Sequence, residues 1–82
     1  LIVIEDIGAD YTESMENISL VDEEELKYFI DNYSLSRIIL FNRQDRPTYM
    51  LKYVNPKNQN QSIVFYFDSR TGELYQHEKF GF

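Results

Sequence analysis

The sequence predicts an α+β fold in which one amphipathic helix packs on a three- to four-stranded antiparallel β-meander. Three observations predict it: apolar residues recur at helical spacing after Asp22, the spacing shortens to every second residue beyond Ser34, and a turn signature from Asp68 to Gly72 joins two β-rich segments. The chain has 82 residues and no cysteine, so we expect one small domain without disulfides. This single domain, 1–82, divides into an acidic N-terminal strand or arm (1–18) and a helix plus meander (19–82).

The N-terminal third carries the helix. Residues 1–5 can form a short strand, and the polar stretch 6–17 has no clear period, which is typical of a loop. Asp22 is the expected N-cap, with Glu25 three residues later as in a capping box and Val21 placed to contact Leu26. The helix that follows has its apolar positions at i, i+3, i+4 and i+7, which makes one stripe suited to cover a sheet: Leu26, Phe29, Ile30 and Tyr33.

The sequence beyond Ser34 predicts four successive strands, at 37–42, 48–54, 63–67 and 73–79. Turn residues fill the connections 44–47, 55–61 and 68–72, and we expect the second of these to be a seven-residue loop. In the third, Asp68 can accept a hydrogen bond from the backbone two residues on, and Gly72 can adopt a positive φ. Because apolar side chains occur on both faces of the sheet, one face is expected beneath the helix and the other to be partly solvated.

Charge is distributed unevenly along the chain, whose net charge is −6. Residues 1–34 contain ten acidic side chains and one basic side chain, whereas residues 35–82 contain seven basic and four acidic ones. The simplest interpretation is an acidic, solvated side of the domain that pairs loosely with a basic sheet.

The order of one helix and a meander closed by Asp68-Ser69-Arg70-Thr71-Gly72-Glu73-Leu74 resembles the PepSY family of small bacterial α+β domains. The resemblance covers about residues 19–78 and also involves the helix start at 19–24 and the strand pair 47–53 and 63–67. The alanine-rich helical face common in that family is missing here. The resemblance implies a non-enzymatic module that regulates or inhibits a peptidase, or that supports a cell-envelope protein. It favours an extracytoplasmic location, and without it a cytoplasmic one is expected.

Direct signs of catalysis or cofactor binding are missing from the sequence. His77 is the only histidine, and we expect it to be solvated on the last strand, with no second ligand for a metal site. A calcium loop at 68–72 would need an oxygen ligand where Arg70 stands, and three glycines do not make a phosphate loop. The prediction is therefore a protein that is not an enzyme and has no catalytic, cofactor or metal site.

Another protein is the expected partner, and two surfaces are candidates. The first is a sheet face with arginines at its turns: Tyr49, Tyr53, Tyr66, Arg46 and Arg70. The second is an acidic surface that would make the domain a decoy or immunity-type inhibitor of a basic protein: Glu13, Glu16, Asp22, Glu23 and Glu24.

A third alternative is single-stranded nucleic acid stacked on a basic and aromatic sheet. The acidic arm and a pI near 4.6 disfavour it. We expect contact with a membrane only through segments outside this chain.

Overall fold

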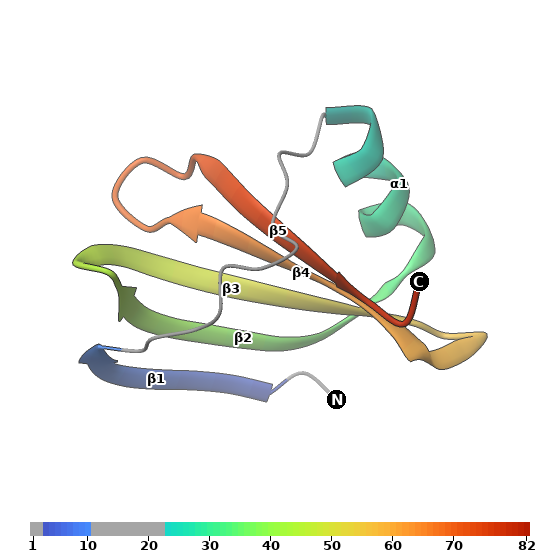
Figure 1. Ribbon diagram of the computed structural model, residues 1–82, viewed down its shortest axis with the longest axis horizontal. Helices are drawn as coiled ribbons and strands as arrows, with labels where there is room; N and C mark the ends of the chain where they lie inside the picture. The colour runs from blue at the N-terminus through green and yellow to red at the C-terminus, as the bar shows by residue number, and fades with distance from the viewer. Residues whose placement is uncertain (1–2, 11–22) are drawn as a thin grey trace.

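The computed structural model describes residues 3–10, by their backbone alone, and residues 23–82 with their side chains. The elements follow in the order β1 (Val3–Asp10), α1 (Glu23–Asn32), β2 (Ser34–Arg43), β3 (Arg46–Asn55), β4 (Asn58–Asp68) and β5 (Leu74–Phe80). The strands of the described residues form one sheet in the spatial order β1-β2-β3-β4-β5 (Figure 1). The predicted α+β fold, one helix followed by a four-stranded antiparallel meander, is confirmed in β2 to β5.

Strand β1 is longer than the sequence indicates. The segment 6–10, expected in a loop, continues the strand as far as Asp10, while Leu1 and Ile2 lie outside the described residues. β1 runs parallel to β2, with Val3 opposite Arg37 and Asp10 opposite Asn42. Parallel neighbours need a crossover connection, and α1 belongs to the one between β1 and β2.

Helix α1 attaches to the sheet through a narrow stripe. Phe29 is buried, and Leu26 and Tyr33 pack around the same cluster. Ile30, expected on this stripe, is 46% exposed, because a ten-residue helix meets the sheet along little more than one row. The predicted N-cap Asp22 lies outside the described residues. In the described part of the chain, no helix is long and apolar enough to cross a membrane.

Two apolar clusters occupy the two faces of the sheet. On one face Phe29 of α1 packs on Tyr53, Ile63 and Phe65, and on the opposite face lie Ile39, Phe41, Met50, Val64 and Tyr66. Strand β4 belongs to both, since successive side chains of a strand point to opposite faces and the four from Ile63 to Tyr66 are all at most 5% exposed. The face away from α1 is therefore more buried than the sequence suggests.

Three turns connect the strands of the meander. Gln44 and Asp45 both have positive φ, 51° and 62°, which makes the β2–β3 connection a two-residue type I′ turn. The expected loop 55–61 is shorter: Asn55 pairs with Asn58, only Pro56 and Lys57 form the turn, and β4 already begins at Asn58.

The β4–β5 turn agrees with the prediction. The Arg70 backbone amide donates to Asp68 Oδ1 at 2.8 Å, and Gly72 has φ 76°. The Gly72 amide also donates to the Asp68 carbonyl at 2.8 Å. Asp68 therefore organises the turn through both its side chain and its backbone.

Candidate functional site

The three tyrosines predicted to share one sheet face lie on two faces. Tyr49 and Tyr53 project to the side of α1, opposite Phe67 and Ile63 in the β3–β4 register. Tyr66 pairs with Met50 and therefore projects to the other side. The grouping was wrong because the β3–β4 register decides which residues of β4 share a face with Tyr49 and Tyr53, and the alternation within each strand does not reveal that register.

Burial further separates the tyrosines. Tyr66 is fully buried and Tyr53 is 9% exposed, and burial raises the pKa of the Tyr53 phenol above its ordinary value. Tyr49 is half-buried, with its ring stacked on Phe67 at a centroid distance of 4.9 Å. Neither Tyr53 nor Tyr66 offers a free ring face on which a nucleotide base could stack.

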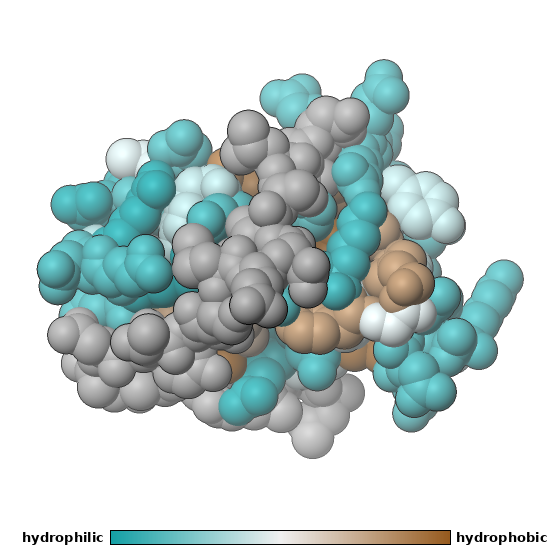
Figure 2. Space-filling view, in the orientation of Figure 1, coloured by the Kyte–Doolittle hydropathy of each residue, from teal (hydrophilic) through white to brown (hydrophobic). Residues whose placement is uncertain are grey.

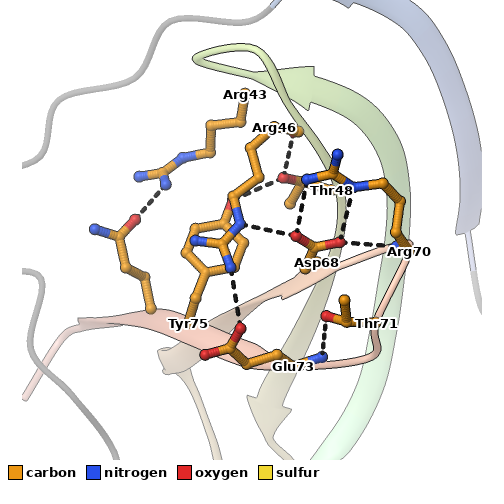
Figure 3. A network of polar contacts seen from close by, with 9 residues as sticks. Arg43, Arg46, Thr48, Asp68, Arg70, Thr71, Glu73 and Tyr75 are labelled. Carbon is orange, nitrogen blue, oxygen red and sulfur yellow. Dashed lines mark hydrogen bonds and ion pairs between the residues drawn. The ribbon is translucent and has the colours of Figure 1, made fainter.

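The two predicted arginines, by contrast, come together on one carboxylate (Figure 3). Arg46 Nε donates to Asp68 Oδ2 at 3.1 Å, and Arg70 Nη2 lies 3.4 Å from the same oxygen. Arg46 begins β3, so the register of β3 with β4 brings it to Asp68, whereas Arg70 reaches Asp68 from two residues away in the β4–β5 turn. Both arginines were predicted site residues, whereas Asp68 was expected only to form the turn.

Asp68 is held in its charged form. Its side chain is 5% exposed, and its pKa is lowered to about 2, first by the hydrogen bond from the Arg70 backbone amide and then by the Arg70 side chain, with a smaller contribution from Arg46. A carboxylate with such a pKa does not exchange protons near neutral pH. It anchors the arginines and is unsuited to general acid or base catalysis.

Tyr75 completes this arrangement, and sequence reasoning missed it. The Arg46 guanidinium lies 3.8 Å from the centroid of the Tyr75 ring, and the Tyr75 hydroxyl is 2.7 Å from that of Thr48. Arg46 Nη2 also reaches Glu73 Oε2 at 3.3 Å. Tyr75 occupies an irregularity in the β4–β5 pairing, between the pairs Tyr66–Gln76 and Phe67–Leu74, which no local sequence signal reveals.

We call this group the arginine turn cluster, made of Arg46, Asp68, Arg70, Glu73 and Tyr75. Beside it the Arg43 guanidinium lies 4.2 Å from the centroid of the Tyr66 ring, and Arg43 donates a hydrogen bond to Gln76. The Arg46 and Arg70 side chains are 35% and 66% exposed, so both remain accessible to a partner. Fixed, exposed guanidinium groups are suited to bind carboxylates.

His77 differs from its prediction. It is 2% exposed rather than solvated, because it lies opposite Phe65 on the α1 side of the sheet. Its ring centroid is 6.4 Å from that of Phe65. Within residues 23–82, no group of three or more His, Cys, Asp or Glu side chains could hold a metal ion.

The alternative acidic surface is only partly described. Glu13, Glu16 and Asp22 lie outside the described residues. Glu23 and Glu24 are exposed in the first turn of α1. Negative charge at this end of a helix is itself stabilising, so the two side chains have a structural role whether or not they meet a partner.

Comparisons with known proteins give no relative for this chain: no family model, no curated protein and no solved structure matches it. The PepSY resemblance therefore stays a prediction from the sequence.

Proposed function

We propose that this domain is a non-enzymatic interaction module that binds an acidic segment of another protein through the arginine turn cluster. The observation that carries the proposal is the fixed placement of Arg46 and Arg70 on the buried carboxylate of Asp68. Arginine and tyrosine are the residue types that contribute most often to the binding energy of protein interfaces. Prior ordering of their side chains lowers the entropy cost of binding.

An aromatic ring lies within the cluster: Tyr75 is half-buried and packs against the apolar residues on the face of the sheet opposite α1. Tyr49 and Phe67 pair in the row beside Thr48 and Asp68 but project to the α1 side, where Leu40, opposite Tyr49, is 37% exposed. Figure 2 shows hydrophobic surface between hydrophilic side chains on the face in view. We therefore expect a partner segment in which acidic residues flank an aliphatic or aromatic one.

The PepSY resemblance would make the partner a peptidase or a cell-envelope protein, and that part of the proposal depends on the resemblance alone. The buried positions of Tyr53 and Tyr66 argue against the nucleic-acid alternative, which we do not propose.

Selection of a random peptide display library on the domain tests the proposal. Selected peptides should be enriched in Asp or Glu beside an apolar residue, and Arg46→Gln or Arg70→Gln should weaken their binding about tenfold. Lys57→Gln, at an exposed residue of the β3–β4 turn, is the matched control and should leave binding unchanged. Peptides without acidic enrichment, or equal affinity for the arginine variants, would refute the proposal.

A second candidate is the acidic decoy, favoured by the exposure of Glu23 and Glu24. Charge reversal with Glu23→Lys and Glu24→Lys should abolish binding of a basic protein while the circular dichroism spectrum stays unchanged. If the reversed variant binds with the same affinity, this surface is excluded.

A further inference from the structure

Two carboxylates contact Arg46 in the arginine turn cluster, and they differ in how firmly they are held (Figure 3). Asp68 Oδ2 accepts from Arg46 Nε at 3.1 Å, and the Asp68 side chain is 5% exposed. Glu73 Oε2 lies 3.3 Å from Arg46 Nη2, and the Glu73 side chain is 65% exposed. An ion pair with such an exposed partner is weak. Glu73 is therefore the carboxylate that another group can displace from Arg46.

The backbone of Glu73 places its carboxylate beside Arg46. The Glu73 amide donates to Thr71 Oγ1 at 3.2 Å, and the Glu73 carbonyl accepts from the Asp68 amide at 2.8 Å. Because both backbone groups are bonded within the β4–β5 turn, the side chain starts from a fixed point near the guanidinium. A carboxylate held in the same molecule competes with one in solution at a high effective concentration.

Arg46 offers a complete binding group once Glu73 has left it. Its guanidinium lies 3.8 Å from the centroid of the Tyr75 ring, which fixes its plane. Asp68 occupies Nε, so Nη1 and Nη2 remain as a fork that can donate two parallel hydrogen bonds to one carboxylate. Among the described residues, the contact of Glu73 with this fork is a single one, at Nη2. A carboxylate of a partner can therefore bind Arg46 with better geometry than Glu73 does.

The charges of the cluster favour the same exchange. Two cations, Arg46 and Arg70, face two anions, Asp68 and Glu73, so the charges of the cluster balance while Glu73 is in place. Displacement of Glu73 leaves an excess of one positive charge at the guanidinium. An incoming carboxylate restores the balance, whereas a neutral side chain does not.

We propose that Glu73 is an internal competitor, which occupies on Arg46 the position that a carboxylate of the partner takes in the complex. This inference rests on the proposed function, because it specifies where the acidic segment docks and which group it displaces. The partner is then a segment with an Asp or Glu that can reach Nη1 and Nη2 of Arg46, and Glu73 lowers the affinity for it.

An NMR titration of the full chain with the peptide N-acetyl-Glu-Leu-Glu-Phe-Glu amide tests the competition. Glu73→Gln keeps the shape of the side chain and removes its charge, and it should tighten peptide binding about threefold to fivefold, as expected for the loss of an exposed ion pair. Asp45→Asn is the matched control. It removes the same charge from an exposed residue next to Arg46, for which the structure shows no ion pair with Arg46, and should leave the affinity nearly unchanged.

A double-mutant cycle tests whether the gain depends on the contact between Glu73 and Arg46. When Arg46 is already replaced by Gln, Glu73→Gln should no longer tighten binding, because the competitor then has no guanidinium to occupy. A gain of the same size in both backgrounds would show that Glu73 only repels the peptide through space. That result would overturn the inference.

A neutral peptide separates this inference from the proposed function. N-acetyl-Gln-Leu-Gln-Phe-Gln amide should bind the wild type and the Glu73→Gln variant equally weakly. If the acidic peptide binds neither protein better than the neutral one, the proposed function fails and this inference with it. If the acidic peptide is preferred but Glu73→Gln gives no gain, or Asp45→Asn gains as much, the internal competitor alone is refuted.

Discussion

At the scale of single residues, Asp68 links the turn, the sheet and the candidate site. Its backbone and side chain both close the β4–β5 turn, and its carboxylate holds Arg46 and Arg70. An Asp at a turn entry is predictable from sequence because it reflects local backbone geometry. The arginine contacts are not predictable in this way, since Arg46 lies 22 residues away along the chain.

Acid should weaken the fold through Asp68. The pKa of this carboxyl is about 2 in the folded protein against an ordinary value of 3.8, so the stabilisation is present above about pH 4 and is lost as the pH falls toward 2. Asp68→Asn should lower the urea midpoint at pH 7, and its difference from the wild type should shrink between pH 4 and pH 2. If the urea midpoints of the two proteins fall by the same amount as the pH is lowered, other carboxyls cause the loss of stability in acid.

The loss of stability on replacing Gly72 should depend on backbone conformation alone. Its φ is 76°, and a Cβ at this position would meet no atom within 4 Å. Gly72→Ala should therefore cost about 1 kcal/mol of unfolding free energy, the price of a left-handed conformation. Gly72→Asn should cost less, because Asn tolerates that conformation better. Equal losses for the two variants in urea unfolding would contradict this explanation.

At the scale of elements, the pairing register between neighbouring strands decides which side chains share a face. Alternation within β3 and within β4 is visible in the sequence, but the register between them is not. With Val54 opposite Ser62, Tyr66 lies opposite Met50 rather than beside Tyr49 and Tyr53. A shift by an odd number of residues exchanges the two faces of a strand, and the shift of three residues between the pairs Asn55–Asn58 and Val54–Ser62 is not visible in the alternation of either strand.

The β2–β3 turn offers a route to higher stability. Gln44 and Asp45 both occupy the left-handed region, where a type I′ turn favours Asn followed by Gly. The double variant Gln44→Asn and Asp45→Gly should raise the unfolding free energy by about 1 kcal/mol. Lys57→Gly, in a turn without positive φ, is the control and should give no gain. No increase in the double variant would contradict the turn assignment.

At the scale of the whole molecule, the two clusters on the two faces of the sheet explain how 82 residues without a disulfide fold. The helix and the four meander strands were predictable because their periods are local properties of the sequence. The parallel pairing of β1 with β2 was not, since it depends on contacts across the segment that holds α1. The arginine turn cluster was half predictable: its arginines lie at recognisable turns, whereas Tyr75 reaches it through an irregular pairing.

Helix α1 should be the first element lost when its anchor is removed. Phe29 is its only buried residue among those described and contacts Tyr33, Phe65 and Phe82 through its ring. Phe29→Ala should cost about 3 kcal/mol. Amide hydrogen exchange should show greater loss of protection in α1 than in β3 and β4. Uniform loss across the sheet would show instead that the helix and sheet unfold as one unit.

The parallel strand β1 has a practical consequence for choosing domain boundaries. A protein limited to residues 19–78, which carry the family-like pattern, would lack β1. The ten-residue β2 would then be an exposed apolar edge strand that can pair with other chains. A protein shortened to begin at residue 19 should form oligomers in size-exclusion chromatography, and so should the full chain with Ile4→Pro, which keeps the net charge. If both stay monomeric, β1 is not needed to prevent association. If both associate, β1 protects the edge of β2 from pairing with other chains.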